Sequence, residues 1–208
     1  AGPGLLDSYD AERRPVALAT SARASARSVE HSHPGFAPAP GIGAGKRGGI
    51  LNIVLGYRYP KGAVLGADPG QPVVPDGMNL TGQPGSRAPH LWLRRAGERI
   101  SSLDLYERSL VLLSDAESAG GAAWHAAARR IADTERLRLD TYRIGAAGSG
   151  ADLVYDADDA DWAALHGTTA DGAVLVRPDG FVAWRSEGAV PDPEGELREL
   201  LGRVLRRR

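Results

Sequence analysis

The sequence contains no cysteine, and this absence removes several kinds of chemistry at once. Disulfides, thiolate metal ligands, thiol nucleophiles and dithiol redox pairs all need a cysteine side chain. A thiol oxidoreductase is therefore excluded. Lysine is also scarce, because only Lys46 and Lys61 occur among the 25 basic residues. This bias indicates a GC-rich coding sequence rather than a mode of binding.

The sequence also lacks a strong net charge and a long apolar run. Its formal charge is −1, so electrostatics give no reason to expect a nucleic-acid or anionic-membrane partner. No apolar run approaches the length of a membrane span, and the first residues have no signal-peptide architecture. These absences predict a soluble cytoplasmic protein whose partner is neither nucleic acid nor membrane.

The first third of the chain mixes one helical segment with irregular stretches. Residues 5–30 are rich in Ala, Arg and Glu and predict an amphipathic helix, with a kink or a helix start near Pro15. Residues 34–49 are dense in Pro and Gly and predict a loop. A strand-like segment, "ILNIVLGYRY", follows at 50–59, and a second irregular stretch runs from 60 to 89.

From residue 90 onwards, apolar patterning predicts an α/β domain. Apolar or alternating runs predict strands at 90–93, 109–114, 139–145 and, as a hairpin around a Pro-Asp-Gly turn, 172–185. Helical spacing predicts helices at 119–135, 158–166 (closed by Gly167) and 193–207. A strand–helix–strand unit, then a helix, a hairpin and a closing helix, is the connectivity of a thioredoxin-like fold with a central mixed sheet flanked by helices.

The glycine-rich stretch Gly43-Ala44-Gly45-Lys46-Arg47-Gly48 formally matches GxGxxG. That motif binds a pyrophosphate only when it links a strand to a helix. Here the preceding segment, "APAPGI", is no strand, and the following segment, "GILNIVL", is no obvious helix. It is not a P-loop either, because Arg47 stands where Ser or Thr is required. A flexible connector is the favoured interpretation, with nucleotide binding as the alternative.

Four carboxylates cluster in "DADDAD" at 156–161. A calcium loop of the EF-hand type needs glycine at its sixth place and a bidentate acid at its twelfth, where this chain has Asp161 and Gly167. The cluster therefore predicts a helix cap, with Asp158 or Asp159 capping the helix that carries Trp162.

The histidines do not form an obvious site. His31-Ser32-His33 has the spacing of a weak metal pair but no third ligand nearby in sequence. His90, His125 and His166 are scattered, and none accompanies a nucleophile motif. The four tryptophans (92, 124, 162 and 184) are expected to be core or interface anchors. The residues alone thus nominate no catalytic, cofactor-binding or metal-binding residue.

Five blocks of the sequence resemble, in order, the group A flavoprotein aromatic hydroxylases, which are para-hydroxybenzoate-hydroxylase-like monooxygenases. The blocks are "LLDSYDAERRPVA" (5–17), "LGYRYPKGAV" (55–64), "TGQPGSRAPHLWL" (81–93), "LYERSLVLLS" (105–114) and "DGAVLVRPDGFVAWR" (171–185). The likeness is strongest to bacterial polyketide hydroxylases, such as those acting on anthracycline and angucycline skeletons. It reaches nearly to the C-terminus.

The resemblance also implies a redox-inactive domain, since the last portion of these enzymes is similar to thioredoxin. It places the thioredoxin redox pair at Asp115, Ala116, Glu117 and Ser118, and the facing proline at Asp171-Gly172. In these hydroxylases the domain is taken to be structural, packing on the catalytic part or helping dimerisation.

By this resemblance, the chain is expected to be the C-terminal portion of an FAD- and NAD(P)H-dependent monooxygenase that hydroxylates an aromatic or polyketide substrate. The family's N-terminal glycine-rich turn, its later Gly-Asp motif and its substrate-domain sheet are not found, so no catalytic or flavin-contacting residue is carried over. No FAD is expected on this portion alone. The expected partner is a flavin-binding catalytic domain, in the same or a separate chain, with a homodimer as a further expectation.

The expected division is a helix of the flavin-binding part (1–33), a Pro/Gly-rich linker with one strand-like segment (34–81) and a thioredoxin-like domain (82–208). The alternative is a stand-alone, non-catalytic thioredoxin-like interaction module. The helix at 5–30 separates the two hypotheses. In a complete module its apolar face packs on its own domain or on a partner, whereas in a cut fragment it is expected to be disordered or bound in a dimer.

Overall fold

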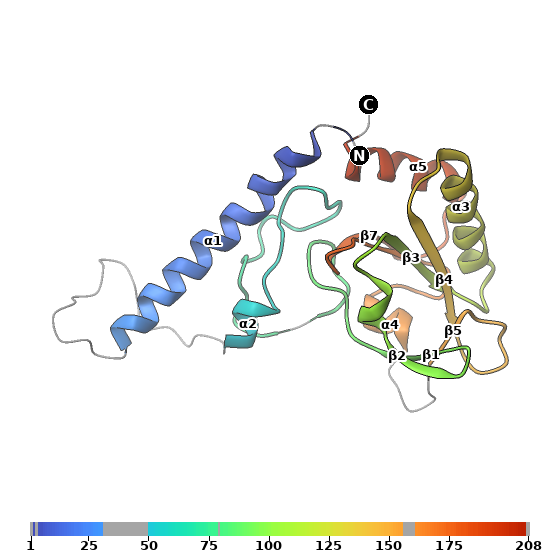
Figure 1. The fold of residues 1–208 in the computed structure, drawn as a ribbon, viewed down its shortest axis with the longest axis horizontal. Helices are drawn as coiled ribbons and strands as arrows, with labels where there is room; N and C mark the ends of the chain where they lie inside the picture. Colours follow the sequence, from blue (N-terminus) through green and yellow to red (C-terminus); the bar gives the residue numbers. More distant parts are fainter. Residues whose placement is uncertain (1, 3, 31–49, 79, 156–160, 207–208) are drawn as a thin grey trace.

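A long helix and a mixed sheet are joined by irregular segments in the computed structural model of the chain (Figure 1). The structure describes residues 2, 4–30, 50–78, 80–155 and 161–206. Helix α1 (Leu5–Glu30) points away from the sheet, and the segment 50–78 lies between them (Figure 1). The two ends of the chain meet where the Gly2 amide donates to the Leu205 carbonyl at 2.8 Å.

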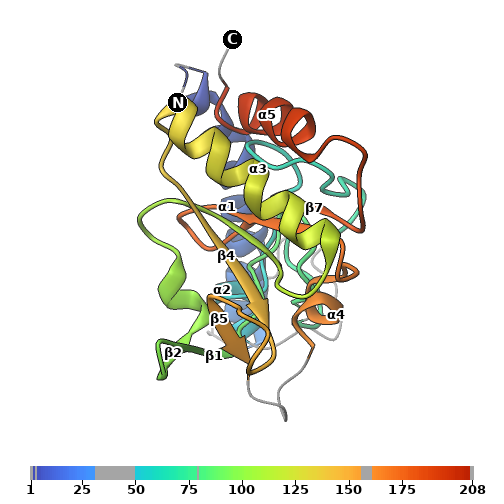
Figure 2. The ribbon, with the colours of Figure 1, turned by 90° about the vertical axis from the view of Figure 1, so that its right-hand side faces the viewer.

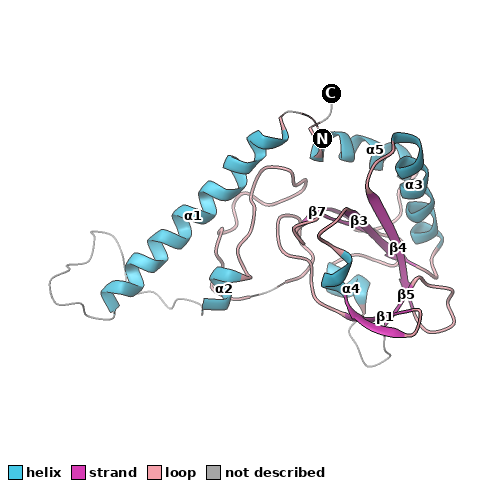
Figure 3. Ribbon diagram, viewed as in Figure 1, coloured by secondary structure: helices cyan, strands magenta, loops and turns pink. Residues whose placement is uncertain are grey.

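Seven strands form one sheet in the order β2-β1-β5-β4-β3-β6-β7 (Figure 3). Strand β3 is parallel to β4, and β4 is parallel to β5, whereas the other neighbours are antiparallel. The strands are β1 (Trp92–Arg95), β2 (Glu98–Ser101), β3 (Leu110–Asp115), β4 (Leu139–Gly145), β5 (Leu153–Tyr155), β6 (Ala173–Val176) and β7 (Val182–Ser186).

Helices cover both faces of the sheet (Figure 2). The remaining helices are α2 (Ile50–Val54), α3 (Ala119–Glu135), α4 (Trp162–His166) and α5 (Pro193–Val204), with a 3-10 turn at Ser102–Leu105. On one face, α3 and α5 pack Trp124, Ile131 and Leu197 against Leu112 of β3. On the other face, α4 packs Trp162 against Val111 and Leu113. The first four residues of β3, 110–113, are all apolar and buried, as expected for a strand covered on both faces.

The regular C-terminal part confirms the predicted α/β fold. The predicted helix at 119–135 and strand at 139–145 have the observed bounds of α3 and β4. The order β4-β3-β6-β7, with α3, α4 and α5 as connections or closing helix, is the thioredoxin-like arrangement. Gly167 ends α4 at φ 64, and Pro193 begins α5, both as predicted.

The strand-like prediction at 50–59 is wrong, because residues 50–54 form helix α2. The side chain of Asn52 donates to the carbonyl of Asp76, and the Leu55 amide donates to the Leu51 carbonyl at 2.7 Å. A strand here would need a sheet edge. The edge of β7 is already occupied, since the amides of Leu65 and Gly85 donate to its carbonyls.

Three other elements differ in detail from the prediction. Helix α1 runs continuously through Pro15, so no helix starts there. Strands β2 and β5 were not predicted, because β2 is mostly polar and β5 has only three residues. Asp161 is the N-cap of α4, its carboxylate accepting from the Ala163 amide at 2.9 Å. Asp158 and Asp159, the predicted caps, lie outside the described residues.

The tryptophan prediction holds for two of the four side chains. Trp124 and Trp162 are fully buried, whereas Trp184 is half-buried and Trp92 is 40% exposed. Among the described residues, none of the helices combines the length and the apolar character that a membrane crossing requires.

Replacing Gly180 by alanine should destabilise the fold by roughly 1 kcal/mol, because this glycine has φ 77 in the β6–β7 turn. An added Cβ meets nothing closer than Tyr106 Cδ2 at 3.8 Å, so the cost is backbone strain alone. Gly202→Ala is the matched control. It adds a methyl group to α5 with nothing within 4 Å and should stabilise the protein. Equal effects of the two substitutions in urea unfolding would contradict the turn assignment.

Stability should also fall in mild acid through His166. This imidazole donates from Nδ1 to the Trp162 carbonyl at 2.8 Å, and its Nε2 is buried without a partner among the described residues. Burial lowers the pKa of His166 from 6.5 to about 4. The folded state therefore binds fewer protons than the unfolded state between these values. Its free energy of unfolding should drop as pH falls from 6.5 to 4, by up to about 1.4 kcal/mol per pH unit. His166→Asn should flatten that slope, and an unchanged slope would show that another group controls it.

Candidate functional site

The segment that links α1 to the sheet runs along the outer edge of β7. The Tyr59 amide donates to the Gly85 carbonyl at 2.8 Å, and the Leu65 amide donates to the Ala183 carbonyl at 2.7 Å. Residues 85–87 take the adjoining part of that edge, where the Val182 amide donates to the Ser86 carbonyl. The irregular segment thereby completes the sheet edge and presents its other side to α1.

A buried ion pair joins α1 to the β6–β7 turn. Arg177 donates from Nη1 to Glu12 Oε1 at 2.7 Å and from Nη2 to Glu12 Oε2 at 2.9 Å. The Glu12 side chain is 5% exposed and the Arg177 side chain 14%. The Ala63 amide also donates to Glu12 Oε1, at 2.7 Å, and Arg177 pairs with Asp179 at the same distance. We name the contacts of Glu12, Ala63 and Arg177 the α1 junction.

The electrostatics of the α1 junction favour the charged state of the arginine. Burial acts to lower the pKa of Arg177, but the bonds to Glu12 and the charge of Asp179 outweigh it and raise that pKa. Gly62, at φ 119, lies against the Glu12 carboxylate, where an added Cβ would collide with it. The glycine therefore lets the 57–64 segment approach α1 closely.

An aromatic cluster extends the α1 junction. Tyr59 stacks on Phe181 with ring centroids 4.2 Å apart, and Tyr57 packs against both rings. Arg13, one residue after Glu12, donates from Nη1 to the hydroxyls of Tyr59 at 3.0 Å and Tyr57 at 3.2 Å. Burial raises the pKa of Tyr59 to about 12. Tyr59 is therefore neutral near pH 7, and the hydroxyls of both tyrosines anchor α1 by accepting from Arg13.

Two cavities flank this region. An apolar one, of about 480 Å³, lies beside the start of α1 and is lined by Leu5, Leu6, Tyr9 and Leu205. Leu6 and Tyr9 are 82% and 67% exposed, so the apolar character continues onto the surface. A single turn of α1 thus carries a buried charge on one side and exposed apolar side chains on another.

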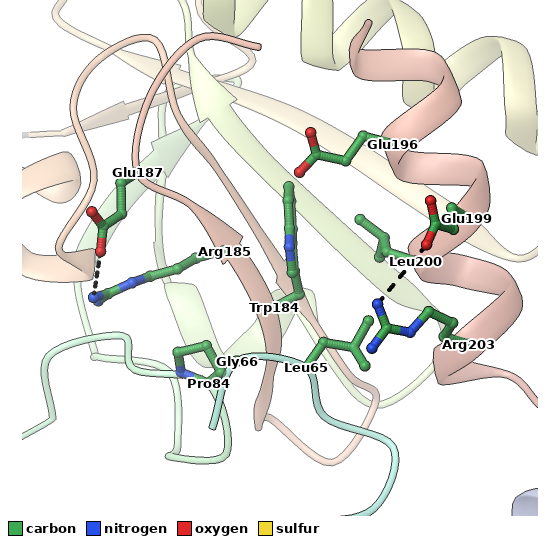
Figure 4. A pocket seen from close by; sticks show the side chains of 10 residues that line it. All are labelled: Leu65, Gly66, Pro84, Trp184, Arg185, Glu187, Glu196, Glu199, Leu200 and Arg203. Carbon is green, nitrogen blue, oxygen red and sulfur yellow. Dashed lines mark hydrogen bonds and ion pairs between the residues drawn. The ribbon is translucent and has the colours of Figure 1, made fainter. Parts of the chain in front are cut away.

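The second cavity, also about 480 Å³, lies between β7 and α5 (Figure 4). Trp184 stands at its centre, and the charged side chains around it pair with one another. Arg185 contacts Glu187 at 3.4 Å, and Arg203 contacts Glu199 at 4.0 Å. Arg185 also donates to the carbonyls of Thr81 and His166. With Glu196 added, the lining has three carboxylates and two guanidinium groups.

The positions that correspond to a thioredoxin redox pair do meet in space. The Ser118 hydroxyl donates to the Ala170 carbonyl at 2.7 Å, and the Gly120 amide donates to the Asp171 carboxylate at 3.0 Å. Asp115 accepts from the amides of Glu117 and Ser118. Oxygen atoms that form hydrogen bonds therefore occupy the place where a redox thioredoxin fold has thiols.

The structure separates the other sequence candidates. His31, His33 and the glycine-rich stretch at 43–48 lie outside the described residues. His90 is exposed and packs edge-on against Trp92, whereas His125 contacts the Thr141 hydroxyl at 3.1 Å. In the part of the chain that the structure describes, no three His, Asp or Glu side chains gather as a metal site would require. The α1 junction was not predicted, although Glu12, Ala63 and Arg177 each lie in one of the blocks that resemble the hydroxylases.

Comparison with known proteins places these features in a family. Residues 81–207 match the family model described as "Aromatic-ring hydroxylase, C-terminal". A Streptomyces halstedii protein named as a polyketide hydroxylase is 64% identical over 207 residues, which cover 99% of this chain and 37% of that protein. Tetracenomycin A2 monooxygenase-dioxygenase of Streptomyces glaucescens is 38% identical over 207 residues, covering 100% of this chain and 34% of the relative.

Comparison with solved structures supports the same family. The crystal structure of aklavinone-11 hydroxylase with FAD and aklavinone matches with a TM-score of 0.81 at 34% sequence identity. That match covers 100% of this chain and 36% of the hydroxylase. The chain therefore spans little more than a third of the length of the proteins that it matches.

Breaking the α1 junction should cost much of the stability. Arg177→Met leaves the Glu12 carboxylate buried without its partner, which typically costs about 3 kcal/mol or more. Adding Glu12→Gln to Arg177→Met should recover part of that loss, because no buried charge then remains. The measurement is urea unfolding of both variants and of the wild type.

Arg198→Met is the matched control for charge removal. Arg198 pairs with Glu135 and Glu194 on the surface and should be removed with little change in stability. A loss for Arg177→Met no larger than that for Arg198→Met would show that the α1 junction does not hold the helix.

Proposed function

Because this chain belongs to the aromatic-ring hydroxylases as a C-terminal part, we propose that it is the C-terminal portion of an FAD- and NAD(P)H-dependent monooxygenase hydroxylating an aromatic or polyketide substrate. In this proposal the portion itself is structural. The observation that carries it is the match to aklavinone-11 hydroxylase, which includes all of this chain but 36% of that enzyme. The named reactions of the relatives supply the substrate class, since they act on polyketide or phenolic rings.

The described residues fit FAD poorly, and this supports a structural role for the portion. A flavin dinucleotide places its pyrophosphate on free backbone amides at a helix N-terminus. At the N-terminus of α3, the Gly120 amide is bonded to Asp171 and the Gly121 amide to Ser118 Oγ. The cavity of Figure 4 has an excess of carboxylates, which repel a pyrophosphate. These residues do not fit FAD, so we assign the flavin to another part of the enzyme.

The proposed partner is the flavin-binding catalytic domain, in the same or a separate chain. Exposed Leu6 and Tyr9 beside the apolar cavity offer it a surface to pack on. The proposal keeps the division into 1–33, 34–81 and 82–208, a cytoplasmic location, and homodimerisation as a second use of the domain. No residue of this portion is assigned to catalysis or to cofactor binding.

A chimera tests the proposal directly. The 208-residue chain replaces the matching 37% of the Streptomyces halstedii relative, to which it is 64% identical. The chimera should retain FAD and oxidise NADPH, and the 208-residue chain alone should show neither flavin absorbance nor NADPH consumption. Arg177→Met in the chimera should lower the melting temperature and FAD retention while leaving turnover per bound flavin unchanged.

Two results would contradict this function. Stoichiometric flavin on the chain alone would show that it holds the cofactor itself. A drop in turnover per bound flavin for Arg177→Met, with melting temperature and FAD content intact, would place this portion in the chemistry. Failure of the chimera to fold is resolved by co-expressing the chain with the remaining part of the relative as a separate polypeptide. Association of the two would support the structural role, and no association would favour a stand-alone module.

A further inference from the structure

A small cavity lies between α3 and β4. Figure 2 shows how α3 passes over this strand. The ladder between β4 and β5 ends where the Asp152 amide donates to the Arg143 carbonyl at 3.0 Å. Thr141 and Tyr142 of β4 lie beyond that point, next to the end of β1. The resulting notch has a volume of about 350 Å³ and is lined by Arg95, Ala96, His125, Arg129, Thr141, Tyr142 and Asp152.

The charges around the notch do not cancel. Among the described residues, neither Arg95 nor Arg129 has a carboxylate partner. Asp152 is already engaged, since its Oδ2 accepts from the Arg143 amide at 2.8 Å and lies 3.7 Å from the Arg143 guanidinium. Two guanidinium groups and one carboxylate, that of Asp152, therefore line the cavity, and the lining carries a net positive charge.

The shape of the notch holds these cations in place. The Arg95 guanidinium lies 5.2 Å above the Tyr142 ring, a cation–π contact that orients it along the wall. Arg129 follows His125 by one helical turn of α3, so both side chains leave the same face of the helix. A ligand between β1 and α3 thus meets a guanidinium from each side.

His125 adds a hydrogen-bond donor. Burial lowers the pKa of His125, and the nearby positive charges of Arg143 and Arg129 lower it further against the opposing charge of Asp152. The imidazole is therefore neutral near pH 7. When the Thr141 hydroxyl donates to Nδ1, across 3.1 Å, the ring proton resides on Nε2. That N–H is then available as a donor to an anion.

We propose that this notch binds a phosphate group, either free or as a phosphomonoester. The guanidinium groups of Arg95 and Arg129 supply the positive charge that a phosphate requires, and their planar N–H forks match its oxygens. The imidazole N–H supplies a neutral donor to a further oxygen. The site is separate from the α1 junction and does not depend on the proposed hydroxylase role.

The test is a titration of the 208-residue chain with inorganic phosphate, followed by NMR of the His125 ring at constant pH. The His125 signals should shift saturably, and chloride at matched ionic strength should not reproduce the shift. Arg129→Gln and Arg95→Gln should each weaken the binding about tenfold, as expected for the loss of one charge-assisted hydrogen bond.

Arg130→Gln is the matched control, one residue from Arg129 on α3. Its guanidinium pairs with Glu194 at 2.7 Å, outside the notch, so phosphate binding should be unchanged. Both arginines of the notch are exposed, so their variants should keep the wild-type melting temperature. Equal weakening by Arg129→Gln and Arg130→Gln would overturn the proposal, because it would show non-specific attraction to a basic helix. No saturable shift with phosphate would overturn it as well.

Phenyl phosphate, as a second probe, distinguishes the two sources of the phosphate group. Binding at least as tight as that of inorganic phosphate identifies a phosphomonoester site, with the phenyl group directed to the open side. Binding of inorganic phosphate alone identifies a site for the free ion. Both results support a phosphate notch.

Discussion

The arrangement of the whole chain depends on the buried bidentate contact between Glu12 and Arg177. These residues are 165 positions apart, and the amide that completes the carboxylate's bonding belongs to Ala63, in a third segment. Two charges removed from water stabilise a protein only when their bonds are satisfied. Here both carboxylate oxygens and both guanidinium forks have partners. The contact therefore specifies one position of α1, since a shifted helix would leave a buried charge unpaired.

The Glu12–Arg177 contact is important because few other side chains of α1 are buried. Among the side chains of α1 at positions 5–25, Ser8, Glu12 and Val16 are the buried ones, and Leu5 packs partly buried against the core. Burial of so few apolar side chains gives this part of the helix little stabilisation. The order of assembly in the structure follows from this. The sheet presents the edge of β7, residues 57–65 and 85–87 cover that edge through backbone bonds, and α1 is placed on the segment so formed.

Local signals made the C-terminal part predictable. An apolar run marked β3, and the helical spacing of apolar residues marked α3 and α5. The irregular segment was not predictable in this way, because its partners lie far off in sequence. An apolar run such as "ILNIV" can form either element, and the occupied edge of β7 decides for the helix. The notch near His125 was not predicted for the same reason, since β1, α3 and β4 each contribute one part of it.

The N-terminus of α3 has the position of the thioredoxin redox site but oxygen atoms in place of thiols. In a redox thioredoxin fold, the positive end of this helix lowers the pKa of a thiol. In this chain Ser118, Asp171 and Asp115 supply oxygens to the same end and its neighbouring turn. Those bonds stabilise the turn, but they also consume the amides that a reacting anion would use. The amides of Gly120 and Gly121, which already donate within the chain, are not free to bind a cofactor.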